Sequence, residues 1–95
     1  MRVRVGSVAQ ADLRALPGPT RKRLKAALER VREDPVGLKG LLDVRRLQTS
    51  GLQSSLYRLR IGQWRIVYRF RGNDAEVIRV FHRSEGYSWM ERLGF

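Results

Sequence analysis

Apolar and polar residues alternate along most of the chain from Leu56 to Arg83. This pattern predicts β-strands, because successive side chains of a strand point to opposite faces of a sheet. Glycine-bearing turns at residues 62–63 and 72–74 divide the stretch into three strands, which we expect to form an antiparallel meander. A shorter alternation at residues 2–6 predicts another strand at the start of the chain.

The residues after this first strand predict two helices. Ser7 and Gln10 have the spacing of a capping box, before a short helix that ends at Pro17. A longer helix is expected between Pro19 and Pro35. Its apolar residues recur at the spacing of one helix face: Leu24, Ala27, Leu28 and Val31. Two helices joined by a short link form an αα-hairpin.

The two remaining segments have weaker patterns. Residues 35–55 show no clean period, and we expect an irregular connector with three leucines packed against the core: Leu41, Leu42 and Leu47. Residues 84–95 predict a short helix or hook whose apolar side consists of Trp89, Met90 and Leu93. The sum is a single α+β domain over residues 1–95, with the helices on one face of the sheet.

The two turns of the meander determine which residues lie opposite each other. A two-residue loop at residues 62–63 pairs Arg60 with Arg65. At the next turn, a two-residue loop would place Arg79 opposite a core residue. A three-residue loop at residues 72–74 is therefore expected, because a shift of one residue moves every side chain to the other face.

With the three-residue loop, Ile66 pairs with Val80 and Tyr68 pairs with Ile78. The face of the meander that does not pack on the helices is then expected to be open, and it contains seven arginines: Arg58, Arg60, Arg65, Arg69, Arg71, Arg79 and Arg83. Three apolar residues lie between them: Val67, Val77 and Phe81. Of the two acids in the meander, Asp74 falls in a turn and Glu76 is expected on the opposite face.

Charge supports an anion-binding surface. The chain has 20 Lys+Arg against 9 Asp+Glu, a net charge of +11, which favours a polyanionic partner. Arginine binds phosphate through two parallel hydrogen bonds. The alternative is a basic face that contacts only solvent. Phe81 either stacks on a nucleic-acid base or is covered by the C-terminal segment.

The chain offers little conventional catalytic chemistry. It has no cysteine and one histidine, so no metal site is evident and we expect no cofactor. RNA, however, supplies its own nucleophile, the 2′-hydroxyl. Arginines can stabilise the charge that develops on the phosphate, and the candidates for proton transfer are Tyr87, His82 and Glu85.

The start of the chain lacks the apolar stretch of a signal peptide, and no window reaches the roughly 18 apolar residues of a membrane span. We therefore expect a soluble, cytoplasmic protein that contacts no membrane.

The stretches YRLRIGQWRIVYRF and VIRVFHRSEGY resemble the RelE/ParE toxin superfamily of bacterial and archaeal toxin–antitoxin systems. The initial strand, the helical hairpin and the LKGL before the meander also fit, so the resemblance spans nearly the whole chain. It implies a microbial-RNase-like fold and a cognate antitoxin. For RelE-type members it implies metal-independent cleavage of mRNA in the ribosomal A site, with contact to ribosomal RNA and inhibition of translation.

The resemblance also implies roles for individual residues. Arg58 and Arg60 occupy two basic positions that are often lysines in RelE members, where one of them is proposed as the base; arginine here shifts that role to Tyr87. Arg65 matches the arginine that supports the transition state. Arg83 and Tyr87 match the arginine that ends the last strand and the tyrosine after it.

Around this catalytic set we expect further RNA-binding residues: Arg69, Arg71, Arg79 and Phe81. Phe81 departs from the family pattern, which usually has glycine at that position. Two other readings remain open. ParE-type members share the fold and inhibit DNA gyrase without catalysis, and a decayed member would only bind its antitoxin.

Overall fold

The computed structural model describes residues 1–48 and 55–95. These residues form a five-stranded sheet in the order β1-β5-β4-β3-β2. The strands are β1 (Arg2–Val5), β2 (Val44–Leu47), β3 (Leu56–Ile61), β4 (Trp64–Arg71) and β5 (Asp74–His82). β1 pairs with β5 in parallel, and the other neighbours are antiparallel. The predicted α+β fold with its meander is confirmed.

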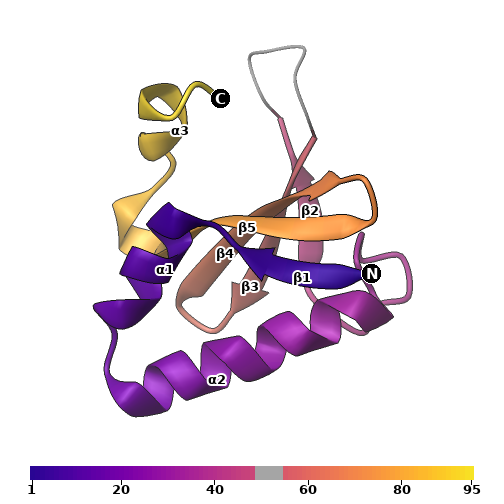
Figure 1. Cartoon of the computed structure of the whole chain (residues 1–95), viewed down its shortest axis with the longest axis horizontal. Coiled ribbons are helices and arrows are strands. Elements are labelled where there is room, and N and C mark those ends of the chain that lie inside the picture. The colour runs from indigo at the N-terminus through magenta and orange to yellow at the C-terminus, as the bar shows by residue number, and fades with distance from the viewer. Residues whose placement is uncertain (49–54) are drawn as a thin grey trace.

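Helices lie at both ends of the chain (Figure 1). They are α1 (Ser7–Arg14), α2 (Gly18–Glu29) and α3 (Trp89–Arg92), with the 3₁₀ turns η1 (Arg30–Glu33) and η2 (Arg83–Glu85). In Figure 1, α2 runs along one side of the molecule and α3 lies at the other. No helix in the described ranges is both long and apolar enough to span a membrane.

The capping box expected at the start of α1 is wrong. Gly6 is the N-cap residue, no side chain caps the helix, and Gln10 donates its side-chain amide to the carbonyl oxygen of Val5 (2.9 Å). Helix α1 begins one residue earlier than expected because Gly6, the residue before it, packs tightly against β5. Its N–H donates to the carbonyl oxygen of Val77 (3.0 Å), and a Cβ at Gly6 would lie 2.9 Å from that oxygen.

The main core lies between the sheet and the first two helices. α1, α2 and η1 contribute Ala9, Leu13, Leu24, Leu28 and Val31. The sheet contributes Val44, Leu59, Ile66, Tyr68, Ala75, Val77 and Val80. The predicted apolar faces of both helices are therefore buried against one face of the sheet.

The opposite face of the sheet is partly covered as well. A second buried cluster consists of Leu56, Val67, Phe81 and Trp89. Leu47, Ile78, Met90 and Phe95 pack against it, whereas Leu93 is exposed. The expectation of a fully open arginine face is wrong at this end, because α3 brings Trp89 onto the sheet.

The three-residue loop expected at residues 72–74 of the second hairpin is wrong. The loop has two residues, because Arg71 pairs with Asp74. A β-bulge then corrects the register: Tyr68 pairs with Val77, and Ile78 is the extra residue. Beyond the bulge, Ile66 pairs with Val80 as predicted.

The bulge overturns three predictions made for β5. Tyr68 does not pair with Ile78. Val77 is buried in the main core instead of lying among the arginines. Glu76 pairs directly with Arg69 and so lies on the arginine face. A bulge residue reverses the alternation on one side of it, which is why all three errors occur before Ile78.

The segment before β3 is more regular than expected. β2 lies where an irregular connector was predicted, and it pairs with β3 at the edge of the sheet. Leu42 and Leu47 pack against the two cores as predicted, but Leu41 is exposed. Residues 49–54 of the predicted connector lie outside the described residues.

A buried carboxylate organises the turn that leads into β2. Asp34 is only 1% exposed and accepts hydrogen bonds from the backbone N–H groups of Lys39, Leu41 and Leu42 (2.9, 2.9 and 3.1 Å). The bond from Lys39, followed by the other two, lowers the pKa of Asp34 against the opposing effect of burial. These bonds fix the path of the chain toward β2.

Candidate active site

The hairpin of β3 and β4 places three of the arginines together. Its two-residue loop is the predicted one, with Gly62 at φ 57°, a conformation that glycine adopts at no steric cost. Arg60 therefore lies directly opposite Arg65, as predicted. Like charges in this position destabilise a sheet by a few tenths of a kcal/mol, so the pairing needs another explanation than stability.

Arg65 is the arginine at the centre of this group. One guanidinium nitrogen donates to the carbonyl oxygens of Gly62 and Trp64 (2.9 and 3.0 Å), which fixes the side chain against the turn. Within the described ranges it pairs with no carboxylate. The remaining guanidinium nitrogens are thus not used by an acid of the described chain.

The electrostatics of Arg65 show which groups surround it. Burial lowers the pKa of its guanidinium first, and the neighbouring charges of Arg58, Arg60 and Arg83 lower it further, while Tyr87 acts in the opposite direction. Arginine nevertheless stays charged at neutral pH. The structure thus brings all five predicted catalytic residues into one neighbourhood.

Asp43 is a member of this site that the sequence reasoning missed. Its two carboxylate oxygens pair separately with Arg58 and Arg60, each at 3.1 Å. Its backbone oxygen also accepts the N–H of Arg60 (3.0 Å). Asp43 is the only acid in the sequence between Asp34 and Asp74, and that isolation was the available signal. One carboxylate thus serves two arginines and leaves the group strongly positive.

Arg58 retains a donor that the fold does not satisfy. Its Nε is buried and has no hydrogen-bond partner among the described residues. A buried N–H without an acceptor costs about 1–3 kcal/mol.

Arg45 is a second residue that the sequence reasoning missed. It is exposed and lies directly opposite Arg58 on β2, so it shares the arginine face. Its neighbour Arg46 lies opposite Tyr57 and faces the helix side. Finding Arg45 required the pairing of β2, which the weak pattern of the connector did not reveal.

Tyr87 lies over the end of this face. Its side chain is 38% exposed, and its ring meets Phe81 edge-on with centroids 5.3 Å apart. The hydroxyl makes no hydrogen bond to the described part of the chain. Phe81 itself is only 2% exposed, so the expectation of an open stacking platform is wrong: Tyr87 and Trp89 cover it.

The other two proton-transfer candidates are engaged elsewhere. His82 accepts at Nδ1 from the N–H of Ser84 (3.2 Å), and its Nε2 lies 3.0 Å from Oε1 of Gln63. These partners fit the neutral tautomer with the proton on Nε2. Glu85 pairs with Arg79 at 2.7 Å. Tyr87 is therefore the candidate whose functional atom is free of structural contacts.

Arg79 is not the free cation that was expected. Its guanidinium pairs with Asp12 (2.8 Å) and Glu85 (2.7 Å) and lies over the rings of Phe81 and Trp89. Burial lowers the pKa of Arg79, but the two carboxylates outweigh it and raise the pKa above its usual range. With its side chain 11% exposed, Arg79 connects α1, β5 and η2.

Arg69 and Arg71 are paired as well. Both bind Glu76, at 2.9 and 3.8 Å, and Arg69 lies 5.5 Å from the ring of Phe95. This pairing follows from the bulge, which turns Glu76 onto the arginine face. Of the seven arginines expected to be free, two lack a carboxylate partner within the described residues: Arg65 and Arg83.

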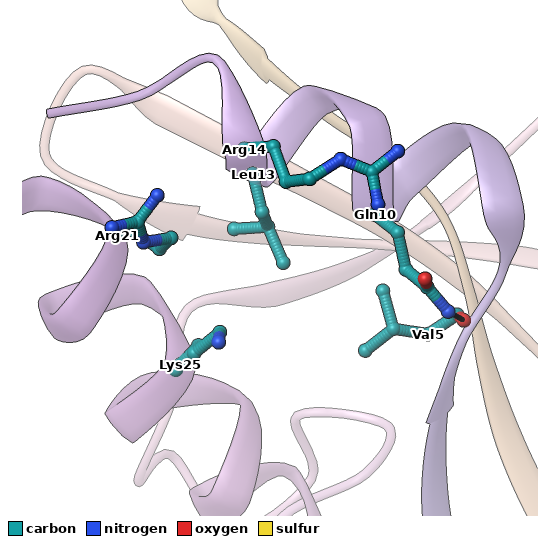
Figure 2. Close-up of a pocket in the computed structure, with 6 residues that line it drawn as sticks. All are labelled: Val5, Gln10, Leu13, Arg14, Arg21 and Lys25. Carbon is teal, nitrogen blue, oxygen red and sulfur yellow. Dashed lines mark hydrogen bonds between the residues drawn. The ribbon is translucent and has the colours of Figure 1, made fainter. Parts of the chain in front are cut away.

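A pocket between the first two helices lies apart from this site. This open pocket of about 310 Å³ lies between α1, α2 and the end of β1 (Figure 2), and its lining shares no residue with the arginine group: Val5, Gln10, Leu13, Arg14, Arg21 and Lys25. In the described ranges, no cluster of three or more His, Cys, Asp or Glu side chains is arranged to hold a metal ion.

Comparisons with known proteins agree with this architecture. Residues 3–87 match the family model of the ParE toxin of type II toxin-antitoxin system, parDE. The chain is 30% identical over 90 residues to toxin RelE3 of Methanocaldococcus jannaschii, and the match covers 94% of this chain and 98% of that toxin.

Two solved structures have a similar fold. The archaeal RelE–RelB complex from Pyrococcus horikoshii OT3 superposes with a TM-score of 0.69 at 22% identity, over 90% of this chain and 97% of that one. The RelB–RelE antitoxin–toxin complex from Methanococcus jannaschii gives 0.64 at 28% identity, over 90% and 96%. The family match, the RelE3 similarity and the shared fold together show that this chain belongs to the RelE/ParE superfamily of toxins from toxin–antitoxin systems.

Proposed function

We propose that this toxin is an endoribonuclease that cleaves mRNA in the ribosomal A site, inhibits translation and is neutralised by a cognate antitoxin. The observation that carries the proposal is the surroundings of Arg65. This arginine has no carboxylate partner in the described chain. It lies opposite Arg60 on one side and Phe81 on the other, and the ring of Tyr87 contacts Phe81. Burial and the charges of Arg58, Arg60 and Arg83 act on its pKa. The positive charges of these arginines repel one another, and a phosphate bound between them would remove that repulsion.

The proposed reaction is an internal transesterification of RNA that needs no metal. The 2′-hydroxyl loses its proton to a protein group and its oxygen attacks the adjacent phosphorus. The bond from phosphorus to the 5′-oxygen breaks, and that oxygen takes up a proton. The products are a 2′,3′-cyclic phosphate and a 5′-hydroxyl end. The chain must therefore stabilise extra negative charge on the phosphate and move two protons.

We assign the roles to individual side chains from their charge, their partners and their position. Arg65 and Arg83 bind the phosphate oxygens and stabilise the charge of the transition state. Arg58 and Arg60, held by Asp43, orient the RNA strand and add to the positive potential. Tyr87 moves a proton, since arginine remains protonated at neutral pH.

Partners are proposed from charge and from the relatives. The two RelE structures compared above are complexes with RelB antitoxins, which supports a cognate antitoxin for this chain. Arg69 and Arg71 share one carboxylate and so keep excess positive charge at the rim of the arginine face. We assign them to contacts with the backbone of mRNA or ribosomal RNA.

Primer extension tests the activity. The purified toxin is added to ribosomes that carry a defined mRNA, and the 3′ ends of reverse transcripts are mapped. We expect new stops at codons in the A site, which disappear when the antitoxin encoded beside the toxin is added. Intact mRNA at toxin concentrations that block protein synthesis would contradict the proposal.

A second function is supported by one observation. The matching family model describes ParE toxins, and ParE-type members inhibit DNA gyrase without catalysis. Induction in cells separates the two activities. A ribonuclease stops incorporation of labelled amino acids first, whereas a gyrase inhibitor first blocks DNA replication and triggers the DNA-damage response.

A further inference from the structure

The edge strand β2 (Val44–Leu47) extends the arginine face beyond the residues discussed so far. Arg45 pairs with Arg58 across the antiparallel ladder of β2 and β3. Paired residues of neighbouring strands project to the same face of a sheet. Arg45 is exposed, and no salt bridge involves it within the described residues. It therefore adds an uncompensated cation to the outer border of the site.

The neighbourhood of Arg45 cannot neutralise it. The nearest acid in sequence, Asp43, already uses both carboxylate oxygens on Arg58 and Arg60. Arg45 opposite Arg58 is a second like-charge pair beside Arg60 opposite Arg65. Each of these two pairs costs a few tenths of a kcal/mol or more, and both pairs lie on the arginine face of the sheet.

Distance gives Arg45 a different task from Arg65. β2 and β4 are separated by β3, and Arg45 is level with Arg58 and Val67, two residues beyond Arg65 along β4. The backbones of Arg45 and Arg65 therefore lie two strand spacings apart across the sheet and two residues apart along it, about 12 Å in all. The carbonyl oxygens of Gly62 and Trp64 hold the Arg65 guanidinium at the turn of the hairpin, whereas Arg45 lies two residues further from that turn. A phosphate bound by Arg65 therefore lies nearer the turn than a phosphate bound by Arg45. We propose that Arg45 is a substrate-binding residue that contacts a phosphate of the RNA strand outside the scissile one, so that the strand crosses the sheet from β4 toward the β2 edge.

This inference rests on the proposed ribonuclease function and adds a direction to it. A residue that binds the strand away from the reacting phosphate contributes equally to ground state and transition state. Its loss therefore raises KM and leaves kcat nearly unchanged. It also lowers the salt dependence of binding, because each phosphate contact on single-stranded nucleic acid contributes about 0.7 to the slope of log K against log salt.

The chain contains a matched control for this test. Arg46 is the next residue on the same strand and is exposed, as Arg45 is. It lies opposite Tyr57 on the other face of the sheet. Arg45→Ala and Arg46→Ala remove the same charge from the same strand. Their thermal melting curves should match that of the wild type, since neither side chain is buried.

The experiment measures binding of a fluorescein-labelled single-stranded RNA by anisotropy at several salt concentrations, and cleavage of ribosome-bound mRNA. Arg45→Ala should weaken RNA binding about three- to tenfold, reduce the salt slope by about 0.7, and raise KM with kcat within about twofold. Arg46→Ala should match the wild type in each measurement.

The outcomes separate this inference from the function on which it rests. If wild-type toxin binds and cleaves RNA but Arg45→Ala equals Arg46→Ala, the role of Arg45 is wrong and the function stands. If Arg45→Ala weakens only antitoxin binding, Arg45 contacts protein and the inference is overturned. If the wild type neither binds nor cleaves RNA, both are wrong.

Discussion

At the scale of single residues, the site depends on which side chains the fold leaves without internal partners. Arg58 and Arg60 share Asp43, and Arg79 is fully paired. Arg65 and Arg83 have no carboxylate partner in the described chain, and the hydroxyl of Tyr87 makes no hydrogen bond there. The proposed chemistry therefore depends on Arg65, Arg83 and Tyr87 more than on the total number of arginines on this face.

Tyr87→Phe isolates the role of the hydroxyl. The substitution keeps the ring contacts with Phe81 and Trp89 and removes an atom that binds nothing in the described fold. If this hydroxyl moves a proton, kcat should fall about 10²- to 10⁴-fold, while KM and the melting temperature stay close to wild type. Single-turnover cleavage of ribosome-bound mRNA is the measurement. An unchanged rate would assign proton transfer to another group.

The sequence predicted that Arg60 and Arg65 lie opposite each other, but it did not predict the acid that pairs with Arg58 and Arg60. Arg60 opposite Arg65 followed from a loop of two residues with glycine first. Asp43 and Arg45 were missed because β2 has four residues without clear alternation, and an edge strand is defined by its neighbour. The sequence left two environments open for Phe81, stacking on a nucleic-acid base or burial under the C-terminal segment. Periodicity assigns a residue to a face of the sheet but does not say which distant segment covers that face.

At the scale of elements, Arg79 connects three of them. Asp12 on α1 binds both the guanidinium of Arg79 and the N–H of Val80 (2.8 Å each), and Glu85 on η2 binds the guanidinium from the other side. These contacts fix α1 and η2 against β5. Arg79 therefore contributes mainly to the position of Tyr87 and the C-terminal segment.

Arg79→Ala should reduce the free energy of unfolding by about 2–4 kcal/mol, because Asp12 is left without its cation in a half-buried position. Arg71→Ala is the control: that side chain is 65% exposed, and its loss should cost less than about 0.5 kcal/mol. Urea denaturation measures both. Equal stability of the two variants would show that Arg79 is not a structural contact.

Asp34 gives an element-scale prediction with a defined pH dependence. Its folded-state pKa is lowered, so its contribution is fully present above the unfolded value of about 3.9 and is lost as pH falls through the folded pKa. Asp34→Asn should destabilise the protein by about 1–3 kcal/mol at pH 7, and the difference from wild type should shrink below about pH 4.

Glu33→Gln provides the comparison for Asp34, since this neighbouring acid is exposed and, among the described residues, pairs only with Arg30. Its effect should stay within about 0.5 kcal/mol at both pH values. Stability curves at pH 7 and pH 3.5 measure the two variants. A deficit of Asp34→Asn that stays constant with pH would mean that the charge of Asp34 contributes nothing.

The register of the second hairpin shows where prediction from pattern ends. Val77 and Ile78 are adjacent apolar residues, so either can face the core without breaking the alternation on one side. The predicted pairing of Ile66 with Val80 is confirmed, but it results from a bulge at Ile78 and not from a longer turn. Local pattern constrains the pairing at each end of a strand but not the position of an inserted residue.

At the scale of the whole molecule, the two faces of the sheet have separate roles. One face is buried under α1 and α2 and forms the main core. The other is divided between an apolar cluster under α3 and the arginine group at the β3–β4 hairpin. Net charge of +11 attracts polyanions to the molecule in general, and the arrangement of Arg65 and its neighbours provides the specific site.

Cleavage of ribosome-bound mRNA by wild type, Arg65→Ala and Arg46→Ala, with analysis of the RNA ends, shows directly whether Arg65 acts in catalysis. Wild type and Arg46→Ala should produce 2′,3′-cyclic phosphate and 5′-hydroxyl ends. Arg65→Ala should lose about 10²- to 10³-fold in kcat while keeping the wild-type circular dichroism spectrum and antitoxin binding. Full activity in Arg65→Ala, or no cleavage by the wild type, would contradict the account.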